Sequence, residues 1–150
     1  MSIINVVGAK IWGGGEQYVY DICKQLQQRH RTAYILVDQS NEDMQSRYAQ
    51  VGHVMTANLY TLKGFLSVNA VAKQMKEQRI NTIVCHSGKY ILFCIALKQL
   101  IGAKLVFIKH NLVPGKTDMY HRWINAQVDS FVCVSKLVYD DLMTPVIKDT

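Results

Sequence analysis

The sequence predicts an α/β domain, with a doubly wound, mainly parallel sheet and helices on both faces. Three observations lead to this fold class. Apolar, β-branched runs recur along the chain, helical periodicities lie between them, and the two kinds of segment alternate in order. At 150 residues the chain has the size of one domain, and 49% hydrophobic residues can supply its core. We therefore expect a single unit over residues 1–150.

Five apolar runs are the predicted strands. Each is nearly continuous rather than alternating, which is typical of strands buried on both faces of a helix-covered parallel sheet. The runs are IINVV (3–7), AYILV (33–37), NTIVC (81–85), KLVFI (104–108) and SFVCV (130–134). The stretch 39–60 fits a short helix and a strand at 53–56 less well.

Helical periodicity fills the segments between these runs. Apolar residues recur three or four positions apart, so that one stripe of each helix can face the sheet. The predicted helices span 16–29, 62–78, 90–101 and 136–142. Gly102 would end the third helix, since glycine is common just past a helix C-terminus, and Ser135 would cap the fourth.

Composition bounds the class of protein further. No apolar stretch reaches the roughly 18 residues of a membrane span, and the N-terminus lacks the features of an export signal, so we expect a cytoplasmic protein.

The four cysteines lie in apolar stretches without a Cys-x-x-Cys pair, so we expect reduced core thiols and no metal site. The net charge of +6 suits a phosphate-bearing ligand, an anionic membrane surface or nucleic acid, and its sign alone does not choose among them.

Three glycines follow the first predicted strand. In open α/β sheets, ligands bind beyond the carboxyl ends of the strands. Gly13, Gly14 and Gly15 lead into the first helix, where backbone N–H groups can approach a phosphate. The competing interpretation is a tight turn that needs positive φ, which explains one or two glycines more easily than three.

Two histidines follow predicted strands further along the chain. An imidazole at such a position can hydrogen-bond a sugar hydroxyl or a phosphate near neutral pH, although a structural hydrogen bond competes as an interpretation. His110 lies between Lys109 and Asn111 and before a Pro-Gly loop, which favours a role in a site. For His86 both interpretations stay open, and Lys116 either meets a phosphate or lies on a solvated surface.

A dinucleotide-binding oxidoreductase is one alternative. Its fingerprint G-x-G-x-x-G is only partly present, because GAKIWG at 8–13 has the outer glycines alone. Asp38 closes the second strand, where a ribose-binding acid would stand.

Taken in order, the motifs resemble the N-terminal domain of family 4 retaining nucleotide-sugar glycosyltransferases, which have the GT-B fold. GGGEQYVYDICKQL resembles the glycine-rich loop and first helix of that family. INTIVCHS, IGAKLVFIKHN and VDSFVCVS resemble its three later strand motifs, and together the four segments cover nearly the whole chain.

The resemblance implies a Rossmann-like N-terminal half of a GT-B enzyme whose C-terminal donor-binding domain is absent here. It implies transfer of a sugar from a nucleotide diphosphate sugar to an acceptor hydroxyl, with retention at the anomeric carbon and without a cofactor. His110 would lie close to the transferred sugar as the catalytic residue. Gly14 and Gly15 would approach the donor phosphate or the acceptor, and Glu16 would begin the helix and brace the loop.

The same resemblance implies the partners. They are a nucleotide-sugar donor, a sugar or lipid-linked acceptor of cell-surface polysaccharide or glycolipid synthesis, and the missing domain, supplied in cis or in trans. The chain alone would be inactive. It would act in the cytoplasm, where the anionic inner face of the cell membrane is a candidate surface for peripheral binding, and would bind no nucleic acid. A non-catalytic partner subunit of a split transferase is a further alternative.

Overall fold

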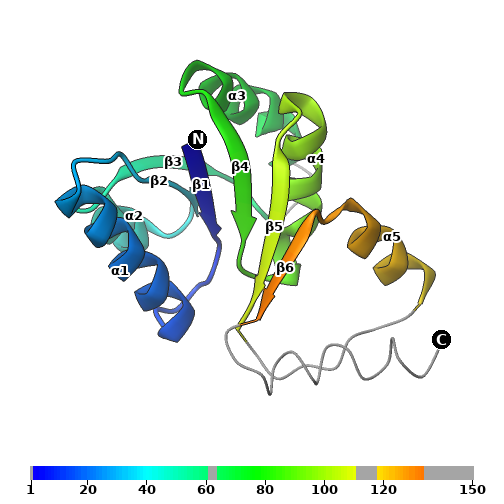
Figure 1. Cartoon of the computed structure of the whole chain (residues 1–150), viewed down its shortest axis with the longest axis horizontal. Helices are drawn as coiled ribbons and strands as arrows, with labels where there is room; N and C mark the ends of the chain where they lie inside the picture. The colour runs from blue at the N-terminus through cyan, green and yellow to red at the C-terminus, as the bar shows by residue number, and fades with distance from the viewer. Residues whose placement is uncertain (1, 61–63, 111–117, 134–150) are drawn as a thin grey trace.

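The computed structural model of the chain describes residues 2–60, 64–110 and 118–133. Within them, six strands form one parallel sheet in the order β3-β2-β1-β4-β5-β6 (Figure 1). The strands are β1 (Ser2–Val7), β2 (Tyr34–Asp38), β3 (His53–Ala57), β4 (Ile80–Cys85), β5 (Lys104–Lys109) and β6 (Ser130–Cys133). The helices are α1 (Gly14–Gln28), α2 (Glu42–Ala49), α3 (Gly64–Glu77), the 3-10 turn η1 (Gly88–Tyr90), α4 (Ile91–Ile101) and α5 (Met119–Gln127).

Helices cover both faces of the sheet, which confirms the predicted doubly wound α/β fold. Figure 1 shows α1 and α2 on one side, and α3, α4 and α5 on the other. Two apolar cores correspond to these two layers, because Val19 and Met44 of the first layer pack with Val37 of β2, whereas Met75 and Phe93 of the second layer pack in another cluster. The strand order reverses at β1, which lies between β2 and β4.

The central strands are buried on both faces, as their continuous apolar runs predicted. Along β1, Val6 packs in one core and Val7 in the other. The expectation fails for the last run, because β6 is the edge strand of the described sheet and its Phe131 and Val132 are exposed. A nearly continuous apolar run therefore did not distinguish an edge strand from a central one.

The described helices follow the periodicity, with one helix that was not expected. The stretch 39–60 forms α2 and β3, and α4 ends where predicted, at Gly102 with φ of 68°. Helix α5 was not expected from the sequence. It begins after Asp118, whose side chain accepts a hydrogen bond from the His121 N–H. The predicted helix at 136–142 and its cap Ser135 lie outside the described residues.

Three of the four cysteines, Cys23, Cys85 and Cys94, are buried as predicted, and Cys133 on β6 is only partly buried. All four are free thiols. Burial raises the pKa of Cys23 to about 11, so this thiol stays protonated and packs as a small apolar side chain.

Asp129, at the amino end of β6, links this strand to β5 and α4. Its Oδ2 accepts a hydrogen bond of 2.8 Å from the Leu105 N–H and lies 3.0 Å from Nζ of Lys98. The Leu105 amide, and after it Lys98, hold the pKa of this carboxyl below its usual range. The acid of the VDSFVCVS motif is thus structural and lies at the amino edge of the sheet.

Gly8 follows β1 directly, at a point where the surrounding residues leave no room for a side chain. A Cβ at this position would lie 2.7 Å from Cδ1 of Tyr90, which is itself buried. The Gly8 carbonyl also accepts a hydrogen bond from the Tyr60 hydroxyl. The path of the chain out of β1 is therefore fixed by two tyrosines.

We predict that Gly8→Ala destabilises the fold. The added methyl group must displace a buried ring, and overpacking of this kind costs about 1–3 kcal/mol. Denaturant unfolding of the chain measures the loss. Gly14→Ala is the matched control, because a Cβ there meets nothing within 4 Å and alanine favours a helix. Equal stabilities for the two variants would contradict the prediction.

Candidate functional site

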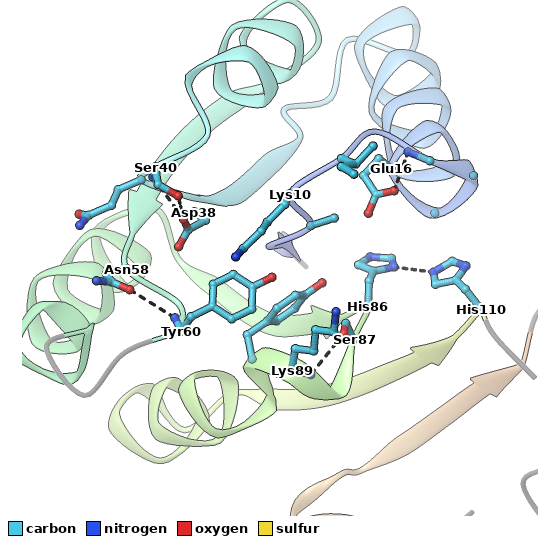
Figure 2. Close-up of a pocket in the computed structure, with 17 residues that line it drawn as sticks. Lys10, Glu16, Asp38, Ser40, Asn58, Tyr60, His86, Ser87, Lys89 and His110 are labelled. Carbon is cyan, nitrogen blue, oxygen red and sulfur yellow. Dashed lines mark hydrogen bonds between the residues drawn. The ribbon is translucent and has the colours of Figure 1, made fainter. Parts of the chain in front are cut away.

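A cleft of about 930 Å³ opens at the carboxyl ends of the strands. It lies where the strand order reverses between β1 and β4, the position at which open α/β sheets bind ligands. Residues that follow β1, β2, β3, β4 and β5 all contribute to its lining (Figure 2). Six of the predicted site residues lie in this lining, namely Gly13, Gly14, Gly15, Glu16, His86 and His110.

The glycine loop enters α1 without the backbone conformation that a tight turn would require. Gly102 is the one glycine with positive φ in the described ranges, so the competing interpretation of glycines 13–15 as positive-φ residues is wrong. A Cβ on Gly14 would meet nothing within 4 Å, and one on Gly15 would lie at ordinary contact distance, 3.7 Å, from the His110 ring. Neither a positive φ nor a lack of space for a side chain explains why position 14 is a glycine.

Glu16 braces this loop from inside the helix. Its Oε2 accepts a hydrogen bond of 3.0 Å from the Gly13 N–H, at the helix N-cap. The first N–H groups of an α-helix have no partner within the helix and carry the positive end of its dipole. Because they lie at the cleft, α1 presents partial positive charge to whatever occupies it.

Trp12 anchors the loop on the outer side, which sequence reasoning missed. Its ring packs 5.9 Å from the Tyr20 ring and 5.3 Å from the Tyr48 ring, measured between centroids. The Arg47 guanidinium lies 4.8 Å from the indole centroid, and the Tyr48 hydroxyl donates a hydrogen bond to the backbone oxygen of Glu16. Aromatic packing against α1 and α2 therefore holds the loop in place before any ligand binds.

His86 and His110, which are 24 positions apart in the sequence, are in direct contact. Nδ1 of His86 lies 2.9 Å from Nε2 of His110, and Nε2 of His86 lies 3.0 Å from Oδ1 of Asn5. Burial, and then the neighbouring His110, lower the pKa of His86 to about 3. Burial also lowers the pKa of His110, although the Glu16 carboxylate opposes that shift. Both rings are therefore neutral at neutral pH.

Asp38 closes the opposite end of the cleft. One carboxylate oxygen accepts a hydrogen bond of 3.0 Å from the Leu59 N–H, and the other accepts from the backbone N–H and the hydroxyl of Ser40. The side chain thereby joins the loops that follow β2 and β3. Because both oxygens have partners within the chain, the geometry favours a structural role for Asp38 over the ribose-binding role that the sequence suggested.

Two lysines line the cleft that the sequence reasoning did not select. Lys10 follows β1 and Lys89 follows β4, and both are exposed. Among the described residues, neither forms an ion pair. Figure 2 shows Lys10 reaching from the glycine loop toward the side of the cleft that holds Asp38 and Tyr60. Their position directly after predicted strands was the sequence feature that could have identified them.

Of the three remaining predicted site residues, the structure describes only Lys109. Lys109 is partly buried at the end of β5 and does not line it. Asn111 and Lys116 lie outside the described residues. In the part of the chain that the structure describes, no group of three His, Cys, Asp or Glu side chains could hold a metal ion, and no helix is long and apolar enough to cross a membrane.

Comparison with known proteins identifies a family. The model of Glycosyltransferase Family 4 matches residues 12–147. A search of curated protein sequences found no match.

Solved structures share the fold at low sequence identity. A glycosyltransferase from Rickettsia africae ESF-5 superposes with a TM-score of 0.79 at 17% identity, over 95% of this chain and 38% of that one. Anabaena Alr3699/HepE in complex with UDP-glucose gives 0.71 at 18% identity, over 96% and 40%. The lipopolysaccharide outer core galactosyltransferase WaaB gives 0.63 at 13% identity, over 96% and 42%. The chain thus spans about two fifths of the length of these proteins.

The pKa of His86 predicts how stability depends on pH. In the unfolded chain His86 has its ordinary pKa of 6.5 and takes up a proton below that pH. In the folded chain its pKa is about 3, so the ring stays neutral until the pH falls that far. The free energy of unfolding should therefore fall as pH drops from about 6.5 toward 4, by at most about 1.4 kcal/mol per pH unit for this residue. His86→Gln should reduce the slope, measured by denaturant unfolding across this range.

His30→Gln is the control for that experiment, since His30 is an exposed histidine beyond α1. The lowered pKa of His110 acts in the same direction and leaves part of the slope in His86→Gln. An equal slope in the wild type and in His86→Gln would contradict the neutral, buried state assigned to His86.

Proposed function

Because the chain belongs to Glycosyltransferase Family 4, we propose that it forms the acceptor-side domain of a retaining glycosyltransferase. The complete enzyme transfers a sugar from a nucleotide diphosphate sugar to an acceptor hydroxyl. One observation carries the proposal. The glycine loop at the N-terminus of α1 and the His110 ring line the same cleft, where the strand order reverses.

The glycine loop supports a ligand phosphate. Gly14 has open space where a Cβ would stand, which is where a ligand would approach the backbone closely. The first N–H groups of α1 are unpaired within the helix and carry its positive dipole, which stabilises an anion. Departure of a nucleotide diphosphate develops charge on phosphate oxygens, and donors of this kind stabilise it without a metal ion.

The two lysines of the cleft support an anionic ligand further. Glu16 and Asp38, the acids in the cleft lining, accept hydrogen bonds from backbone N–H groups, whereas Lys10 and Lys89 have no ion-pair partner among the described residues. Two unpaired ammonium groups attract the diphosphate of a donor or the phosphate of a lipid-linked acceptor. The net charge of +6 favours the same ligands and an anionic membrane surface.

A second domain is part of the proposal. The solved structures that share the fold are about two and a half times as long as the part that this chain matches, which supports a donor-binding domain supplied in cis or in trans. The HepE structure contains UDP-glucose, and WaaB is a lipopolysaccharide galactosyltransferase. We infer by analogy a nucleotide-sugar donor and an acceptor of cell-surface polysaccharide or glycolipid synthesis.

His110 is the proposed contact to the sugar. The ring is half-buried at the cleft, neutral, and held between Gly15 and His86. A neutral imidazole exchanges hydrogen bonds with sugar hydroxyls and adds no charge beside them.

The test joins the chain to a family 4 donor-binding domain and measures sugar transfer from UDP-glucose and other nucleotide sugars. We predict no turnover by the 150-residue chain alone and turnover by the joined protein. His110→Ala should reduce kcat/KM by roughly 10²-fold or more, because loss of a positioning contact at the reacting sugar has effects of this size. His30→Ala, an exposed histidine outside the cleft, is the control.

Three outcomes would contradict parts of this proposal. Unchanged turnover in His110→Ala would refute the role of His110. Calorimetry that finds tight binding of NAD(H) and none of nucleotide sugars would favour the oxidoreductase alternative. Full activity of a stable partner subunit in the absence of this chain would make the chain a non-catalytic subunit.

A further inference from the structure

A buried asparagine interrupts the apolar strand β1. Asn5 is 7% exposed, and its neighbours Ile4 and Val6 are fully buried. A buried polar side chain costs about 1–3 kcal/mol if it has no hydrogen-bond partner. Its carbonyl oxygen Oδ1 has a partner, since it lies 3.0 Å from Nε2 of His86 at the end of β4.

This contact fixes the position of a proton on His86. An amide oxygen only accepts hydrogen bonds, so Nε2 of His86 carries a hydrogen and donates it to Asn5. Burial keeps the ring neutral by lowering its pKa, and a neutral imidazole carries one N–H only. Nδ1 of His86 is therefore the bare nitrogen and acts as an acceptor.

The next ring is set by the same rule. Nε2 of His110 lies 2.9 Å from Nδ1 of His86, which accepts, so Nε2 of His110 must carry the hydrogen. The chain of donors runs from His110 to His86 to Asn5, across β5, β4 and β1. Because His110 is neutral as well, its Nδ1 carries a lone pair, and no hydrogen bond joins it to another described residue.

We infer that Asn5 and His86 are positioning residues that hold His110 in its Nε2–H tautomer, which leaves Nδ1 to accept a hydrogen bond from a substrate hydroxyl. The identity of that hydroxyl rests on the proposed function, whereas the tautomer does not. The consequence for specificity is that neighbouring groups of the cleft select different ligand atoms. Anionic groups bind near Lys10, Lys89 and the helix N-terminus, and a hydroxyl is selected at His110, where a bare nitrogen repels a phosphate oxygen.

Nitrogen NMR of the chain labelled with ¹⁵N-histidine tests the inference directly. The chemical shifts of the two ring nitrogens report which of them carries the proton. In the wild type at pH 6.5–7.5, His86 and His110 should each be a single Nε2–H tautomer. A scalar coupling across the hydrogen bond from Nε2 of His110 to Nδ1 of His86 should also be present.

Asn5→Leu removes the acceptor while keeping a similar side-chain volume. We expect His86 to lose its single tautomer and the coupling to His110 to disappear. Asn81→Leu is the matched control, because Asn81 is an exposed asparagine on β4 and its side-chain hydrogen bond is to the neighbouring Thr82.

Asn5→Asp gives a second test that keeps the size and polarity of the side chain. A carboxylate beside Nε2 should raise the pKa of His86, because it favours the imidazolium form. When His86 takes up its second proton, its Nδ1 becomes a donor, so His110 must switch to the Nδ1–H tautomer at the same pH.

An Nδ1–H tautomer of His110 in the wild type would overturn the inference, as would unchanged tautomers and coupling in Asn5→Leu. A His110 that keeps its tautomer while His86 protonates in Asn5→Asp would overturn it too. These readouts need no substrate. Expected tautomers in a joined protein that transfers no sugar would contradict the proposed function alone.

Discussion

The parallel pairing of β1 with β4 is the contact on which the rest of the site depends. From β1 the chain crosses to α1 on one face of the sheet, and from β4 it crosses to α4 on the other, so the loops beyond the two strands separate. The cleft lies in that separation. The same pairing brings Asn5 beside β4 and makes the hydrogen bond to His86 possible.

The acidic and basic groups of the cleft differ in whether they have partners within the chain. Glu16 and Asp38 accept hydrogen bonds from the backbone and thereby hold three loops, so their charges serve the fold. Lys10 and Lys89 have no ion-pair partner in the described ranges, and the histidines are neutral. The cleft therefore combines positive charge for phosphate with neutral polar groups for hydroxyls.

The fold could be predicted from the sequence because burial on both faces and helical periodicity leave a repeating pattern. A short apolar run carries no pattern that marks an edge strand, so β6 was expected to be buried. Helix α5 was also missed, although Asp118 caps it. The cleft could be placed at the strand ends, and so could its glycines and histidines. The contact between His86 and His110, the anchoring by Trp12 and the structural role of Asp38 depend on which distant side chains the fold brings together, and one sequence does not record this.

We infer that the cleft receives a phosphate at the glycine loop and the two lysines, and a hydroxyl at the neighbouring His110 ring. A crystal structure of the chain joined to a donor-binding domain, with a nucleotide diphosphate sugar and an acceptor bound, would locate both groups. We expect a ligand phosphate within hydrogen-bond distance of the Gly14 and Gly15 amides or the lysine ammonium groups, and a ligand hydroxyl on Nδ1 of His110. Ligands bound away from the carboxyl ends of β1 and β4, with this cleft empty, would contradict it.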